Sequence, residues 1–310
     1  MSKLVKRNNS FEKNIVVELL IHILSFLPHD YFWICEIVCK YWLKSLKNNI
    51  AKKILLSFIP KQMLYHNCLN LNFTPKKLIK IKNYIYAFTL GKICKIDTKN
   101  SDSVVNETNY IFFNFVSSNE NYIVSISVYN SIKIYSPNMN LIDDILLGDI
   151  ARGMTIDDDN NIYVTTYNKF YVYNINGKLI CSWNLVDNSK RKHRSRQIRF
   201  HKNKIYMVDS SFNRLLIFSP KGKLIKSIGK LGSEHGNFKN PWGITVYKDI
   251  IFVVDTGNYR IQAFTCYGKF IFEYIHKGFI DMADIVIENN YAYINDWGSD
   301  YIKKFKLIYD

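Results

Sequence analysis

The feature that most constrains the fold of this 310-residue chain is a repeat that runs through its last three quarters. Each copy has a short apolar run that closes on Asp, Thr or Ile, then a turn, then a second apolar run. The first apolar runs of the copies end at positions 89, 126, 166, 209, 255 and 296, which are 37 to 46 residues apart. The clearest ones are Ile205–Asp209 with Asn213–Phe218, Ile251–Asp255 with Asn258–Phe264, and Tyr293–Asp296 with Tyr301–Phe305.

A period of about forty residues gives each copy room for four short strands. Six such copies are typical of a β-propeller, in which four-stranded sheets are arranged around a central axis. We therefore expect a mainly β fold with a six-bladed propeller over residues 75–310. The aromatic content of 15% agrees with this expectation, because aromatic side chains favour strands.

The sixth copy ends too early to supply a fourth strand. Residues 284–307 account for three strands, and an open edge would be prone to pair with other chains. Residues 58–74 form a linker before the first copy, and within it Leu69–Phe73 alternates as a strand does. We expect residues 66–74 to complete the sixth sheet.

The first sixty residues have a helical rather than a strand pattern. Leu19, Ile23 and Leu27 are spaced by four, which predicts an apolar stripe along a helix that ends at Pro28. Residues 1–9 are polar and predict a flexible tail, and residues 10–57 predict a module of three short helices. Such a module has more apolar surface than it can bury alone, so it should pack on a partner or on the rest of the chain.

The repeat region and the first sixty residues each resemble a known family. Asn240–Val246, Val253–Phe264 and Tyr267–Ile271 resemble one complete NHL repeat. Glu18–Leu20, Ile23–Pro28 and Val38–Trp42 resemble an F-box. The order F-box then NHL propeller is similar to that of F-box/NHL-repeat proteins of giant DNA viruses.

The resemblance implies a non-catalytic substrate receptor of an SCF-type ubiquitin ligase. The F-box would bind a Skp-type adaptor, and through it a cullin scaffold, while the propeller would bind an unknown target protein. It also implies a monomer before complex assembly. The residues expected to bind the adaptor are Leu19, Leu20, Ile23, Leu24, Leu27, Pro28, Val38 and Trp42.

The formal net charge is +16, which favours acidic partners. Basic residues are densest at Lys190–Arg196, between the third and fourth copies. Because chain direction reverses at each strand, the turns between the second and third strands of a blade and the links between blades emerge on one face. We expect that face to bind a target protein or RNA through Arg191, Lys192, Arg194, Arg196, Lys239, Trp242 and Trp297.

Several interpretations of this face remain open at this stage. The basic run fits a solvated loop, an RNA-binding patch, a nuclear-import signal or a site for an acidic peptide held by Arg and Trp. Arg214 and Arg260 fit the face as well, but an NHL repeat implies that Arg260 pairs with Asp255 within the blade.

Little else in the sequence indicates chemistry. The six cysteines lack zinc-ligand spacing, and the seven histidines form no catalytic motif. The run Asp157–Asn160 predicts a polar turn rather than a cation site. We expect no enzyme activity, metal or cofactor. With neither a signal peptide nor a membrane span, an intracellular location, cytoplasmic or nuclear (in the host cell if the protein is viral), is expected.

Overall fold

The computed structural model describes residue 60 and residues 62–71, 74–88, 92–99, 103–109, 113–185, 193–297 and 301–309. The expected tail at 1–9, the expected helices of residues 10–57 and all eight expected adaptor-binding residues lie outside this part. The chain divides into two compact units, one of residues 61–308 and one of residues 1–60 with 309–310. No helix in the described part is long and apolar enough to cross a bilayer.

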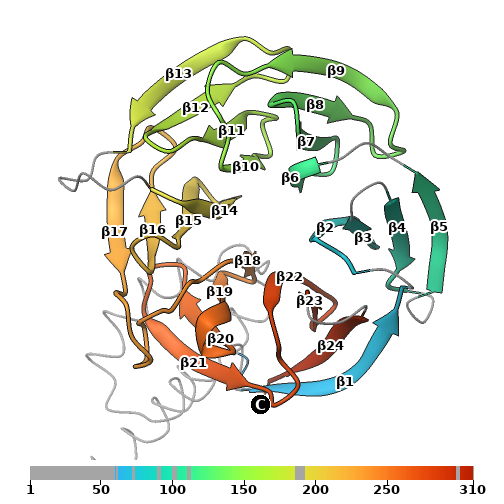
Figure 1. Cartoon of the computed structure of the whole chain (residues 1–310), viewed down its shortest axis with the longest axis vertical. Coiled ribbons are helices and arrows are strands. Elements are labelled where there is room, and N and C mark those ends of the chain that lie inside the picture. The colour runs from blue at the N-terminus through green and yellow to red at the C-terminus, as the bar shows by residue number, and fades with distance from the viewer. Residues whose placement is uncertain are drawn as a thin grey trace, which may run out of the picture. The chain divides into compact units, whose positions relative to one another are not determined.

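The unit of residues 61–308 is a ring of six four-stranded sheets, so the expected mainly β, six-bladed propeller is confirmed (Figure 1). Five sheets each use four consecutive strands, which run from the axis outward: β2 (Lys77–Ile81), β3 (Tyr84–Phe88), β4 (Lys92–Asp97) and β5 (Ser103–Asn109); β6 (Phe113–Ser118), β7 (Ile123–Ser127), β8 (Ser131–Tyr135) and β9 (Leu141–Leu146); β10 (Gly153–Ile156), β11 (Ile162–Thr165), β12 (Lys169–Tyr173) and β13 (Leu179–Asn184); β14 (Ser195–His201), β15 (Lys204–Asp209), β16 (Arg214–Phe218) and β17 (Leu224–Ile228); β18 (Ile244–Tyr247), β19 (Ile250–Asp255), β20 (Arg260–Thr265) and β21 (Phe270–Ile275).

The sixth sheet joins the two ends of the ring. It consists of β22 (Met282–Glu288), β23 (Tyr291–Asp296), β24 (Tyr301–Ile308) and, on the outside, β1 (Gln62–Asn70). β1 pairs antiparallel with β24 from Gln62 opposite Ile308 to Asn70 opposite Tyr301. A strand from before the first blade therefore completes the last one, but it lies four residues earlier than the expected 66–74. Met63, near the start of β1, is fully buried.

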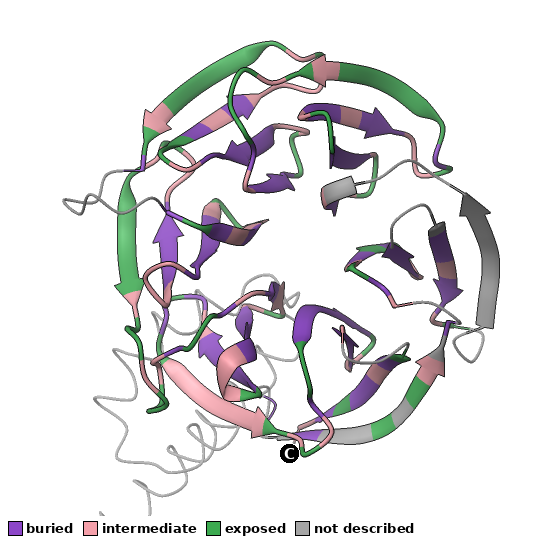
Figure 2. Ribbon diagram, viewed as in Figure 1, coloured by how far each residue is buried: buried purple, intermediate pink, exposed green. Residues whose placement is uncertain are grey.

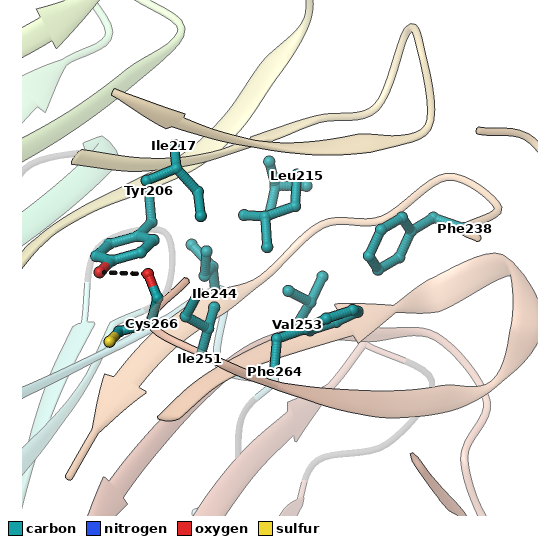
Figure 3. Close-up of a cluster of buried hydrophobic side chains, with 10 residues drawn as sticks. Tyr206, Leu215, Ile217, Phe238, Ile244, Ile251, Val253, Phe264 and Cys266 are labelled. Atoms are coloured by element: carbon teal, nitrogen blue, oxygen red, sulfur yellow. Dashed lines mark hydrogen bonds between the residues drawn. The ribbon is translucent and has the colours of Figure 1, made fainter. Parts of the chain in front are cut away.

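The hydrophobic core lies between neighbouring sheets rather than inside any one of them. In one cluster Tyr206, Leu215 and Ile217 of one blade pack against Ile251 and Phe264 of the next (Figure 3). The Tyr206 hydroxyl donates a hydrogen bond to the Cys266 carbonyl across the same boundary, at 3.3 Å. Each sheet thus needs two neighbours to bury both of its faces, which is why the ring must close.

Burial falls from the axis to the rim of the ring (Figure 2). Strands β7, β10 and β19 are buried along their whole length, whereas β9, β13 and β17 on the outside are largely exposed. The inner strands therefore supply the side chains that line the axis, and the loops at their ends form the surface of the ring around it.

Candidate binding site at the axis of the ring

One face of the ring carries the links that lead from an outer strand to the next inner strand, together with the turns between the second and third strands. On this face Arg196, at the start of β14, lies with its guanidinium 3.7 Å from the ring centroid of Trp242, which precedes β18. Trp242 packs edge-to-face on Trp297, with 4.8 Å between ring centroids. The Lys76 ammonium lies 4.9 Å from the ring of Trp297. Residues from four different blades are therefore in one continuous stack.

A second group of cations lies beside this stack. The Arg152 guanidinium covers the ring of Tyr167 at 4.1 Å and donates a hydrogen bond to its hydroxyl. Arg196 Nε donates to Ser210 Oγ at 3.1 Å, which fixes the direction of that side chain. Burial, together with the charges of Arg194 and Arg152, lowers the pKa of Arg196 to about 10. Arg196 therefore remains charged at neutral pH, close to two other arginines.

We call Lys76, Arg152, Arg194, Arg196, Trp242 and Trp297 the axial cluster. Within the described part of the chain no salt bridge links any of its four cations to a carboxylate. Arg152 Nε and Trp297 Nε1 are buried and donate to no acceptor among the same residues. The cluster thus combines unneutralised positive charge with unused hydrogen-bond donors.

A glycine permits the close approach that builds the cluster. A Cβ on Gly243, next to Trp242, would lie 2.7 Å from the Ala283 carbonyl oxygen of the neighbouring blade, closer than real contacts allow. Only glycine lets the chain after Trp242 lie against β22 in this way. Trp242 is thereby brought within contact of Trp297.

Deeper along the axis lies Asp284 of β22, which is 1% exposed. Its carboxylate accepts hydrogen bonds from the backbone N–H of Leu78 and from Gln197 Nε2, both at 2.9 Å, and its Oδ2 lies 3.2 Å from Lys77 Nζ. Arg199 Nη2 lies 3.9 Å from its other oxygen. One carboxylate therefore holds two cations and joins the inner strands of three blades.

Further polar contacts extend this network to the other inner strands. Gln197 Oε1 accepts from the N–H of Ile244 on β18, and Thr155 Oγ1 on β10 accepts from the N–H of Phe200 on β14. Ser117 of β6 contacts Thr155 through its hydroxyl. β-Bulges at the start of β14 and β22 shift the side-chain alternation by one residue immediately before Gln197 and Asp284. The axis is thus occupied by paired polar groups.

Lys77 provides a pH-dependent test of this arrangement. Burial lowers its pKa to about 8, against an opposing effect of Asp284. Between this value and the ordinary lysine pKa the unfolded chain binds more protons than the folded one, so stability must rise with pH. Relative to Lys77→Met, the free energy of unfolding of the wild type should increase by about 1 kcal/mol from pH 7 to pH 9. Urea unfolding at both pH values measures this, and a constant difference would contradict it.

Other expected site residues have structural roles. Arg260 Nε pairs with Asp255 Oδ2 at 2.8 Å, so the expected pairing within the blade is correct. Arg260 also donates to the carbonyls of Ser233, Glu234 and Asn237, and so holds the link that leads to β18. Arg214 makes a longer contact with Asp209, at 3.4 Å.

Two related contacts were not evident from the sequence. Asp209 also binds the ring of His193, whose Nδ1 lies 2.8 Å from Oδ2. In the last blade Asp296 pairs with Lys303 and accepts the N–H groups of Ile280 and Asp281. Asp296 therefore has the same role as Asp255. Its partner is Lys303, seven residues later, whereas the partner of Asp255 is Arg260, five residues later.

The structure brings together Arg194, Arg196, Trp242 and Trp297 of the seven residues expected on this face. Arg191 and Lys192 lie outside the described residues. Lys239 is exposed, and its backbone N–H is bound by Asp255 Oδ1 at 2.7 Å. The sequence reasoning missed Lys76 and Arg152, although both stand just before an inner strand, where the same argument about chain direction applies.

The expected polar turn at Asp157 is correct, since Asp157 Oδ1 accepts the N–H of Asn161 at 2.7 Å between β10 and β11. Within the described ranges no three His, Cys, Asp or Glu side chains are grouped so that they could hold a metal ion. The site is therefore defined by cations and aromatic rings.

Comparison with known proteins supports the fold. Residues 187–308 match a family model described as a 6-bladed beta-propeller (DUF5128). No curated protein among those compared matches the chain in sequence. The chain is, in structure, a six-bladed β-propeller protein.

Solved structures of similar fold have little sequence identity. A streptogramin B lyase is 16% identical, with a TM-score of 0.56 over 80% of this chain and 89% of the lyase. The virginiamycin B lyase of Staphylococcus aureus is 14% identical, with a TM-score of 0.55 over 78% of this chain and 99% of the lyase. An auxiliary nutrient binding protein of Bacteroides thetaiotaomicron is 12% identical, with a TM-score of 0.58 over 79% of this chain and 75% of that protein. At such identities the likeness concerns the fold alone.

Proposed function

We propose that the chain is a non-catalytic substrate-recognition subunit of an SCF-type ubiquitin ligase. Residues 10–57 would bind a Skp-type adaptor, and through it a cullin scaffold, while the propeller binds the target protein. The observation that carries the proposal is the axial cluster, a docking surface of unneutralised cations and aromatic rings. It stands on a propeller that follows a leucine-rich, F-box-like segment in the same chain.

The arrangement of the axis favours binding over catalysis. Asp284, Gln197, Thr155 and Ser117 hydrogen-bond to one another or to backbone groups of the inner strands. Two of the similar structures are named lyases, but the polar groups on this axis serve to join blades. A receptor acts by raising the concentration of target lysines near the ligase, which requires a rigid surface and no reacting group of its own. In this proposal the chain is a monomer before assembly and acts inside the cell, in cytoplasm or nucleus (of the host if viral).

Co-precipitation of a Skp-type adaptor tests the ligase role. Wild-type chain should recover the adaptor and a cullin, whereas the Leu24→Asp, Leu27→Asp double variant should recover less than about a tenth as much, because charged side chains disrupt an apolar interface. The matched control is Leu141→Asp with Ile142→Asp, a pair exposed on the outer strand β9. It should recover the adaptor normally. Equal recovery by the first variant and the wild type, or none by the wild type, contradicts the proposal.

RNA is the second candidate partner, because unneutralised cations beside aromatic rings also suit phosphates and bases. In this alternative the helical segment is only a packing module. The basic run Lys190–Arg196 in the sequence supports it. RNA is therefore included in the binding experiment described next.

A further inference from the structure

The target chemistry follows from the charges around the axis. Lys76, Arg152, Arg194 and Arg196 lie at one end of it, and Lys77 and Arg199 lie one step deeper. Asp284 is paired with Lys77 and Arg199. Among the described residues, no salt bridge links the other four cations to a carboxylate. An anionic ligand would complete the charge balance at the exposed end.

The arginines are held in place before any ligand arrives. Arg196 rests on Trp242 and is bound to Ser210, and Arg152 rests on Tyr167. A side chain that is already ordered loses little conformational entropy on binding, so its hydrogen bonds contribute more to affinity.

The aromatic rings of the cluster are poorly placed to stack on nucleic-acid bases. Base stacking requires a free ring face. One face of Trp242 is covered by Arg196, one face of Trp297 by Lys76, and the two rings also contact each other edge-to-face. The rings serve to position cations, and the cations present N–H groups to a small anion such as a carboxylate, which arginine binds through two parallel hydrogen bonds.

We propose that the axial cluster binds an acidic peptide segment of the target, with its Asp or Glu carboxylates placed among Arg152, Arg194 and Arg196. This inference rests on the proposed function, which states that the ligand is a target protein. It does not depend on adaptor binding. It assigns the peptide-binding role to the centre of the ring rather than to the exposed outer strands.

Fluorescence anisotropy with the full chain tests the proposal. The probe is a labelled dodecapeptide of alternating Asp, Glu and Gly, compared with the same peptide carrying Asn and Gln, a phosphoserine version, and a single-stranded 12-nucleotide RNA. The acidic peptide should bind at least tenfold more tightly than the neutral one. Tighter binding of RNA than of the acidic peptide overturns the proposal in favour of the RNA alternative, and preference for the phosphoserine peptide overturns the carboxylate assignment.

A pair of charge-matched variants locates the site. Arg152→Gln with Arg196→Gln should weaken binding of the acidic peptide at least tenfold, because two charge-assisted hydrogen-bonding groups are lost. Lys221→Gln with Lys223→Gln removes the same charge from the exposed turn before β17, on the opposite face, and should change binding less than threefold. Equal weakening by both pairs would show a response to net charge alone and would overturn the site. Thermal unfolding verifies that both variants are folded.

A conservative variant separates positioning from charge, and adaptor binding separates the two proposals. Arg196→Lys keeps the charge but loses the planar stack on Trp242, so its affinity should lie between wild type and the double variant.

The arginine double variant should still recover the adaptor. If the wild type binds the acidic peptide but no adaptor, the peptide site stands without the ligase role. If it recovers the adaptor but does not discriminate between acidic and neutral peptides, the peptide site is wrong and the ligase role stands.

Discussion

A chain that begins at residue 75 is expected not to form a stable ring, whereas a chain that begins at Pro60 should unfold cooperatively and remain monomeric. The difference between them is β1, which pairs along the whole of β24. Without it, β24 becomes an open edge in the one blade that joins the two ends of the propeller, and open edges pair with other chains.

The lost packing is large relative to the stability of a domain. Met63 is fully buried and Leu71, just after β1, is 1% exposed in a cluster with Leu78 and Tyr293 of two adjoining blades. Folded domains are stable by only about 5–15 kcal/mol, so the loss of a whole strand with these contacts should exceed what the ring can tolerate. Thermal unfolding followed by circular dichroism, with size-exclusion chromatography, compares the two chains.

A point variant provides the control for truncation. Met63→Asp in the full chain places a charge in the same core without shortening the chain and should lower the unfolding temperature strongly, whereas His66→Asp at an exposed position of β1 should change it little. Similar melting of the chains that start at 60 and 75 would show that the closing strand is dispensable.

Sequence patterns predicted the blades because strand formation depends on local alternation and on turns. The apolar runs at Ile205–Asp209 and Ile251–Asp255 appear as β15 and β19 with boundaries shifted by one residue at most. The face of the cluster followed from chain direction alone, which reverses at every strand whatever the side chains are. Both inferences need only short-range information.

The members of the axial cluster depend on information that is not local. A β-bulge between Ser195 and Gln197 sets the side on which Arg196 lies, and periodicity does not reveal a bulge. The contacts of Trp242 with Arg196 and Trp297 cross blade boundaries, so they depend on the rotation of one sheet against the next. The pair Asp296–Lys303 escaped notice because its spacing differs from that of Asp255–Arg260.

The largest effect of a single substitution on stability is expected at Asp284. Asp284→Ala should lower the free energy of unfolding by about 3–5 kcal/mol, because removing one partner of a buried ion pair leaves the other charge uncompensated. Here Lys77 and Arg199 would both lose their carboxylate, and the N–H of Leu78 and the Gln197 amide would lose their acceptor.

Two further variants separate the charge from the hydrogen bonds. Asp284→Asn keeps an oxygen acceptor and should cost less than the alanine variant, about half as much if charge and hydrogen bonding contribute equally. Asp158→Ala, at an exposed turn position, should stay within about 0.5 kcal/mol of wild type. Urea unfolding gives all three values.

The result bears on how the axis is understood. A large cost at Asp284 would mean that its carboxylate is needed to hold the inner strands together, since it contacts groups on β2 and β14 as well as its own strand. A carboxylate reserved for chemistry is commonly removable with little loss of stability, because its site is arranged for substrate rather than for the fold. A cost below about 1 kcal/mol at Asp284 would therefore contradict the structural role assigned to it and would reopen the axis as a candidate for catalysis.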